Sequence, residues 1–173
     1  MCTSYYLRQL QNMLSDFVTQ TRVKTDEYSI RIKRSESRGQ TLFVLKSTGV
    51  SRFTTGSMEK IRTQLSECAN VSSQFAFILD LTKLIELPLN NVMFWVEFFV
   101  SIRPILKNNI VFTTFVTSLP MLHVAINFGL QVYKPIKPFY IVNDMTEMEK
   151  ETWWESAFKA RDQNVKKNTQ RDD

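Results

Sequence analysis

The chain has 173 residues, a formal net charge of +5 and a hydrophobic fraction of 43%. These values fit one globular domain with one core, and only four glycines and five prolines exclude a fibrous or low-complexity chain. The longest apolar run, Val92 to Val100, is interrupted by Glu97 and is about half the ~20 residues that a membrane-spanning helix needs, so we expect a soluble protein.

An amphipathic helix and a hairpin are predicted at the N-terminal end. Apolar residues recur at helical spacing over residues 4–21, which predicts an added helix within a separate segment, 1–26. From Tyr28 the period changes to two, and a Ser-Arg-Gly turn leads to Thr41–Lys46, which indicates a hairpin. A helix of about eleven residues then begins with Ser57 as its N-cap. Its buried stripe consists of Met58, Ile61, Leu65 and Cys68.

The rest of the chain alternates strands and helices. The continuous apolar run Phe75–Leu81 predicts a central strand covered on both faces. Residues 90–103 are predicted to form a helix that Pro104 kinks or ends. The later predicted elements are strand Ile110–Val116, helix Leu119–Leu130, strand Phe139–Val142 and a helix from Thr146 to about Lys159.

This order predicts an α/β fold. Strand–helix–strand units require right-handed crossovers and helices packed on the sheet. We therefore expect a mixed sheet of about five strands with helices, plus the added N-terminal helix. The domain should span residues 27–158, and 159–173 should form a flexible charged tail.

Basic and sulfur-containing residues indicate no special site. The run Arg31–Arg38 alternates with Ile30 and Ile32 as in a half-buried strand, which favours a solvated strand face over a nucleic-acid groove. Cys2 and Cys68 are far apart and outside any metal or redox spacing, as in proteins of a reducing compartment. We expect a cytoplasmic protein without a metal or cofactor.

Three local patterns carry a family resemblance. They are Gly49–Phe53 leading to Ser57–Ile61, the strand Phe77–Leu81 that contains Asp80-Leu81, and Thr117–Leu130 with its Leu119-Pro120 start and Gly129-Leu130 end. Together with the element order, they resemble the STAS domain of bacterial anti-sigma-factor antagonists and sulfate-type anion transporters. The resemblance implies a non-enzymatic module, a regulatory or assembly subunit, that binds a protein partner beside the loop after the Asp-Leu strand.

That loop departs from the family's pattern. Regulated members carry Asp-Ser-Ser/Thr-Gly there, and a kinase phosphorylates the hydroxyl group. Residues 86–91 read Glu-Leu-Pro-Leu-Asn-Asn and contain no hydroxyl group. The resemblance therefore implies constitutive binding without a phosphorylation switch.

The helix over 90–103 is apolar on two faces, since Phe94 and Phe98 form a second line beside its core stripe. Two alternatives remain open: the second line is buried under the N-terminal helix, or it is exposed and anchors a partner. The partner is another protein or a second copy of the chain. The predicted partner-binding residues are Leu87, Leu89, Asn90, Asn91, Phe94 and Phe98.

A second hypothesis is a small-ligand domain for a nucleotide or a lipid. Open α/β sheets commonly bind ligands at the carboxyl ends of their strands, where Asp80, Thr82 and Ser118 are predicted to lie. An enzyme is the third and weakest hypothesis. His123 is the single histidine and the carboxylates are scattered, so the sequence predicts no catalytic residues.

Overall fold

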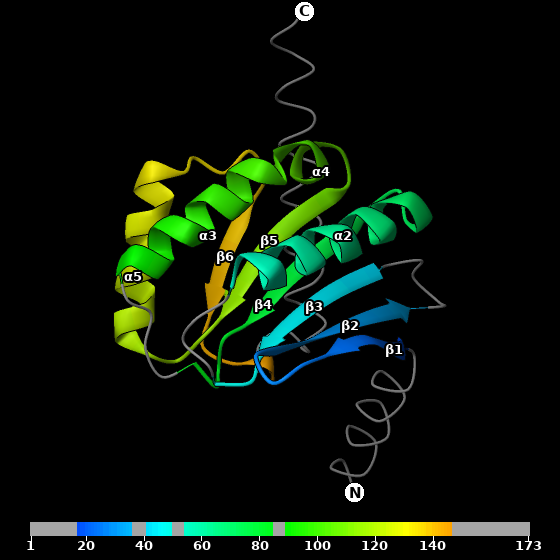
Figure 1. Cartoon of the computed structure of the whole chain (residues 1–173), viewed down its shortest axis with the longest axis horizontal. Coiled ribbons are helices and arrows are strands. Elements are labelled where there is room, and N and C mark those ends of the chain that lie inside the picture. Colours follow the sequence, from blue (N-terminus) through cyan, green and yellow to red (C-terminus); the bar gives the residue numbers. More distant parts are fainter. Residues whose placement is uncertain (1–16, 36–40, 50–53, 85–88, 147–173) are drawn as a thin grey trace, which may run out of the picture.

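A mixed sheet of six strands runs through the molecule with its strands in sequence order (Figure 1). The structure is a computed structural model that describes residues 17–35, 41–49, 54–84 and 89–146. Strands β1 to β3 pair antiparallel, and β3 to β6 pair parallel. Their bounds are β1 Phe17–Lys24, β2 Tyr28–Ser35, β3 Thr41–Ser47, β4 Phe75–Asp80, β5 Ile110–Val116 and β6 Phe139–Val142.

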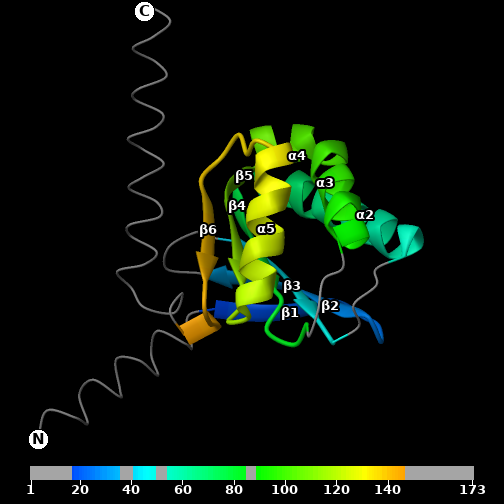
Figure 2. The same ribbon diagram turned by 90° about the vertical axis from the view of Figure 1, so that its left-hand side faces the viewer.

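The described helices all lie on one face of this sheet (Figure 2). They are α2 (Thr55–Val71), α3 (Leu89–Ser101), α4 (Arg103–Asn108) and α5 (Pro120–Val132). Each crossover from β3 to β6 moves one strand in the same direction, so right-handed connections place every helix on the same side. Within the described residues, none of the helices has the length and apolarity to cross a bilayer.

The two faces of the sheet form two apolar clusters. The helix-covered face carries the larger cluster, which includes Phe43, Leu45, Phe77 and Leu79, all at most 1% exposed. Alternate residues of the same strands point to the opposite face. There the second cluster consists of Leu42, Val44, Ala76, Ile78, Val111, Phe112, Val116 and Val142.

The α/β class is confirmed, but the sheet has six strands where five were predicted. The additional strand is β1, which pairs with β2 and occupies residues 17–21 of the predicted N-terminal helix. The helix prediction is wrong there because Val18, Thr19, Thr21 and Val23 are β-branched and find hydrogen-bonding partners along β2. The sheet thus begins before the predicted boundary at 27, and the remainder of that helix lies outside the described residues.

The crossover helices α2 to α5 form where the sequence predicts helices, and the main difference is at the start of α2. Thr54, not Ser57, caps α2: the Thr54 side chain accepts a hydrogen bond from the Ser57 backbone N–H at 3.1 Å. The helix therefore begins earlier and has 17 residues. Helix α3 ends before Pro104, as predicted. Pro104 lies in the first turn of the next helix, α4. The predicted C-terminal helix and tail lie outside the described residues from 147 onward.

Candidate functional site

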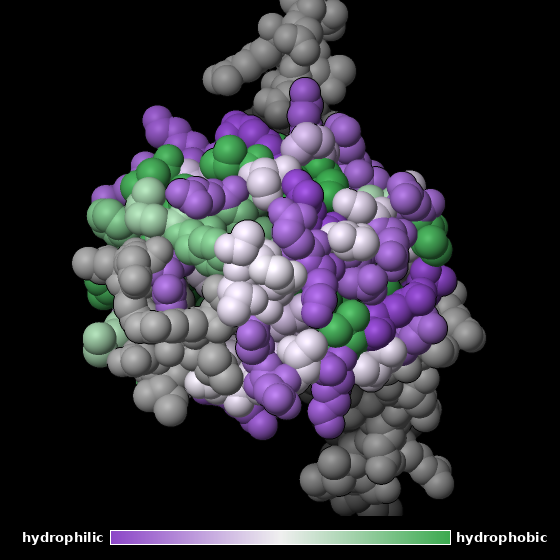
Figure 3. All heavy atoms as spheres, in the orientation of Figure 1, coloured by the Kyte–Doolittle hydropathy of each residue, from purple (hydrophilic) through white to green (hydrophobic). Residues whose placement is uncertain are grey.

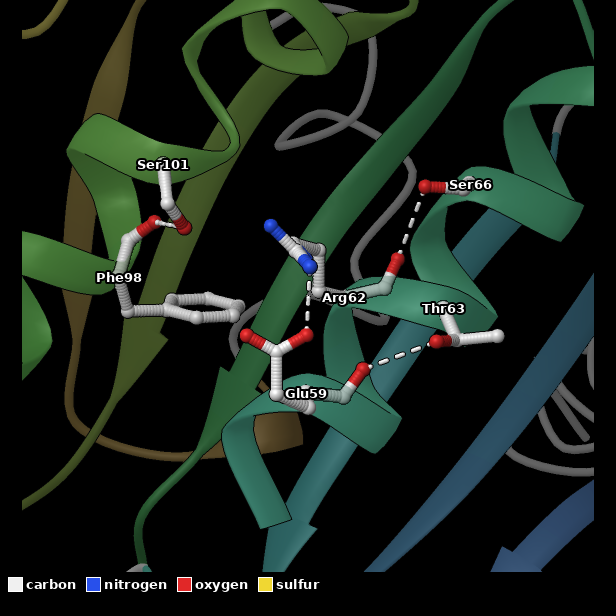
Figure 4. Close-up of polar contacts among 6 residues, drawn as sticks. All are labelled: Glu59, Arg62, Thr63, Ser66, Phe98 and Ser101. Atoms are coloured by element: carbon white, nitrogen blue, oxygen red, sulfur yellow. Dashed lines mark hydrogen bonds and ion pairs between the residues drawn. The ribbon is translucent and has the colours of Figure 1, made fainter. Parts of the chain in front are cut away.

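Phe98 belongs to the core. Its side chain is 5% exposed, and its ring packs edge-on against Trp95 and Phe99 with centroid separations of 5.7 and 5.8 Å. Figure 4 shows the ring extending from α3 towards α2, with the Ser101 hydroxyl donating a 2.7 Å hydrogen bond to the Phe98 carbonyl. Phe98 is thus buried by its neighbours within the fold, and residues 4–16 of the predicted N-terminal helix, its expected cover, lie outside the described residues.

The other predicted partner-binding residues lie around the start of α3. Phe94 is half-buried and packs against the main cluster, and Asn91 is also half-buried. Leu89 and Asn90 occupy the first positions of α3, and Leu87 lies outside the described residues. The exposed apolar side chains of α3 are instead Met93, 39% exposed, and Val100, 53% exposed.

The largest exposed apolar feature of a described helix is on α5. Met121, Val124, Phe128 and Val132 recur every three or four residues and are 76%, 70%, 42% and 51% exposed. This spacing places them on one face, which we term the α5 stripe. The opposite face packs inward through Leu122, Ala125, Ile126 and Gly129. Single exposed hydrophobic residues are ordinary, but an aligned row is typical of a contact surface.

The α5 stripe is uncharged and has a basic end. Helix α5 contains no Lys, Arg, Asp or Glu. Beyond its C-terminal end lie Lys134 and Lys137, and the guanidinium of Arg103 stands 5.9 Å from the Tyr133 ring centre. Figure 3 shows hydrophobic surface over the α3 side of the helical layer and mainly hydrophilic surface over α2.

Sequence reasoning missed the α5 stripe although its signal was present. Helix α5 is apolar on both faces, as α3 is, so residues 120–132 carry the same sequence pattern as residues 90–103. The two helices pack together, and a Cβ on Gly129 would stand only 3.2 Å from Val92 Cγ1. This close approach buries one face of each helix and leaves the α5 stripe outside.

At the predicted ligand crevice, the Asp80 carboxylate is bonded to other groups of the protein. Asp80 is 2% exposed, and its Oδ1 accepts from the Thr82 backbone N–H at 3.1 Å and from the Thr82 hydroxyl at 2.5 Å. Its Oδ2 lies 2.8 Å from Lys46 Nζ. Both carboxylate oxygens of Asp80 are therefore engaged within the protein.

Two further candidates lie near the same end of the sheet. Ser118 is exposed in the turn between β5 and α5. His123 Nε2 donates to the Thr117 carbonyl at 2.8 Å, which ties the first turn of α5 to the end of β5. The contact gives His123 a structural role, and we infer no acid–base site from these side chains.

No family model, curated protein or solved structure matches this chain. The resemblance to the STAS domain therefore remains a hypothesis that rests on the three local patterns and the element order.

Cys68 is a buried thiol beside two arginines. It is 2% exposed on α2 and borders a 300 Å³ groove that Arg22 and Arg34 also line. Burial raises the pKa of the Cys68 thiol to about 11, against the opposing effect of Arg34 and Arg22. A thiol with this pKa is protonated at neutral pH, so Cys68 is a poor nucleophile.

Proposed function

We propose that this chain is a non-enzymatic protein-interaction domain, a regulatory or assembly subunit of the cytoplasm, that binds its partner through the α5 stripe. The supporting observation is the aligned exposure of Met121, Val124 and Phe128 on a helix without charged residues. Burying exposed apolar side chains such as these removes apolar surface from water and so favours association. The proposed binding site is therefore on α5, next to the predicted loop and α3.

The partner that fits this surface is an amphipathic helix of another protein. A helix that lies along the α5 stripe would present apolar residues at every third or fourth position. The basic residues Arg103 and Lys134 at one end favour acidic residues at the corresponding end of the partner helix. A second copy could not provide these acidic residues from its own α5, because α5 contains no Asp or Glu. The basic end therefore favours a different protein as the partner.

The STAS resemblance supports the same class of function. Its implied consequence is constitutive binding, because residues 86–91 offer no hydroxyl group for a kinase. Partner release would then depend on concentration and affinity alone.

The proposal can be tested by selecting displayed helical peptides on the full chain. We expect enriched peptides with apolar residues at i, i+3 or i+4 and i+7 and with acidic residues near one end. Val124→Asp and Phe128→Asp should each weaken their binding about tenfold or more, the loss of ~1.4 kcal/mol or more that a buried charge causes. Far-ultraviolet circular dichroism should remain unchanged, because both side chains are exposed.

The matched control is Val71→Asp, which places the same charge at a 64% exposed apolar position at the end of α2. Peptide binding should be unaffected by it. Enriched peptides that bind wild type and Phe128→Asp equally would overturn the proposal. A dimer in sedimentation that Phe128→Asp dissociates would also overturn it, because the α5 stripe would then bind a second copy.

A further inference from the structure

The sheet face opposite the described helices is apolar and buried. Its side chains form the second cluster, and the eight residues of that cluster are at most 7% exposed. Figure 2 shows that every described helix lies on the other face. Strands β4 and β5 are apolar at most positions, which is typical of strands covered on both faces. No helix among the described residues covers the second cluster, so its cover lies elsewhere.

The apolar part of this face ends at β3. Val44 stands directly opposite Arg31 of β2, and Leu42 stands directly opposite Lys33, so these basic side chains continue the same face. Arg31 is exposed and Lys33 is half-buried. The second cluster therefore extends over β3 to β6, whose outer strands are about 14 Å apart at ~4.8 Å per strand. An α-helix with its side chains is about 10–12 Å wide, so one helix is enough to cover the cluster.

The chain leaves β6 on the side of this cluster. Met145 is half-buried and packs against the second cluster. Met145 and Thr146 are also the first two residues of a helix. Asp144 caps the start of that helix, because its Oδ1 accepts a hydrogen bond from the Thr146 backbone N–H at 2.8 Å. A helix therefore begins in contact with the apolar face.

The sequence after Thr146 matches this position. Trp153, Trp154, Ala157 and Phe158 recur at i, i+1, i+4 and i+5, a spacing that places them on one face of a helix. A helix over residues 145–158 is roughly 20 Å long, and the seven residues of β5 extend over about 23 Å. Four glutamates lie between positions 147 and 155, and their charge is complementary to the basic side chains of β2.

We propose that residues 145–158 form a helix that packs on the second cluster through Trp153, Trp154, Ala157 and Phe158, so that the sheet lies between two helical layers. Residues 1–16 match the surface less well, because they lead into β1, at the edge of the sheet farthest from β6. A second copy also matches less well, because the helix that begins at Met145 already contacts this surface within the same chain. The inference is independent of the function proposed for the α5 stripe.

Nuclear magnetic resonance of the full wild-type chain, with labelled methyl groups, tests the proposal without any substitution. We expect nuclear Overhauser contacts from the indole rings of Trp153 and Trp154 to the methyl groups of Val44 and Ile78. Trp95 belongs to the larger cluster on the other face and should show no contact with these methyl groups. Absence of the Trp153 and Trp154 contacts would overturn the proposal, as would contacts from residues 1–16 in their place. Contacts that arise only between differently labelled copies would also overturn it, because a second copy would then be the cover.

Two variants of the same segment give an independent measurement. Ala157 and Met148 are nine positions apart, so in the proposed helix Ala157 faces the sheet and Met148 lies on the opposite side. Ala157→Glu should lower the urea concentration at the unfolding midpoint and increase the binding of a hydrophobic dye, because it places a charge against the second cluster. Met148→Glu introduces the same charge and should leave both quantities close to those of wild type.

The comparison remains informative if one variant does not fold. An unfolded Ala157→Glu chain beside a folded Met148→Glu chain supports the proposed orientation. Equal shifts of the midpoint in the two variants, or no shift in either, would contradict it.

Discussion

Lys46 Nζ lies 2.8 Å from Asp80 Oδ2, and the two residues stand directly opposite each other in the parallel strands β3 and β4. Lys46 is two positions after Val44, and Asp80 is two positions after Ile78, so all four residues lie on the same face of the sheet. The ion pair therefore lies at the end of the apolar cluster on the face opposite the helices. Asp80 is buried, whereas the Lys46 side chain is 34% exposed. The pair is therefore partly screened by solvent.

Lys46→Met should lower the free energy of unfolding by about 2 kcal/mol, because it leaves the buried Asp80 carboxylate without its cation. Asp80→Asn should be destabilising too, and the double variant should lose less than the sum. Urea unfolding of the four proteins gives the coupling energy directly. Strict additivity of the two losses would show that the two side chains do not interact in solution.

Phe98 and Phe128 should differ sharply in their contribution to stability. Phe98→Ala removes a ring that is 5% exposed and should lower the free energy of unfolding by about 3–5 kcal/mol. Phe128→Ala, at a 42% exposed position of the α5 stripe, should lower it by roughly 1 kcal/mol or less. Chemical denaturation measures both. Comparable losses would place Phe98 outside the core and restore it as a surface anchor.

Thr54→Ala should lower the free energy of unfolding by about 1 kcal/mol, because it removes the side chain that caps α2. Thr63→Ala is the matched control on the same helix, since the exposed Thr63 hydroxyl donates only to the Glu59 carbonyl one turn earlier, at 3.0 Å (Figure 4). Its effect should stay within about 0.5 kcal/mol. Equal losses for both variants would argue against the cap at Thr54.

Cys68 should make the protein less stable at high pH. The folded-state pKa of about 11 exceeds the ordinary value of 9.0, so between these values the unfolded chain loses the thiol proton and the folded chain keeps it. Ionisation then favours the unfolded state, and the contribution of Cys68 to stability is present below pH 9.0 and lost towards pH 11. The total loss is roughly 3 kcal/mol.

Unfolding free energies at several pH values between 8 and 11 test this expectation. Cys68→Ala should reduce the downward slope, whatever its effect at neutral pH. Arg34→Gln should raise the thiol pKa further, because the Arg34 guanidinium opposes the effect of burial. An unaltered slope in Cys68→Ala would assign the pH dependence to the tyrosines, whose pKa values burial also raises.

Much of the fold was predictable because its signals are local. The apolar run of β4 and the proline at the start of α5 each specify an element within a few residues. The predicted stripe Met58, Ile61, Leu65 and Cys68 is the stripe that α2 buries. In contrast, β1 was assigned to a helix, since its apolar residues fit the helical period and its partner strand is non-local.

The candidate site was less predictable for a related reason. Helices α3 and α5 carry apolar residues beyond their core stripes, so the sequence does not show whether the second apolar face is covered or exposed. The sequence by itself determined the order of elements from β2 to β6, because the hydrophobic period acts between near neighbours. Only the tertiary structure decided that Phe98 is internal, that the α5 stripe is external and that Asp80 pairs with Lys46. Those outcomes depend on which distant segments pack together, and a local pattern carries no information about that choice.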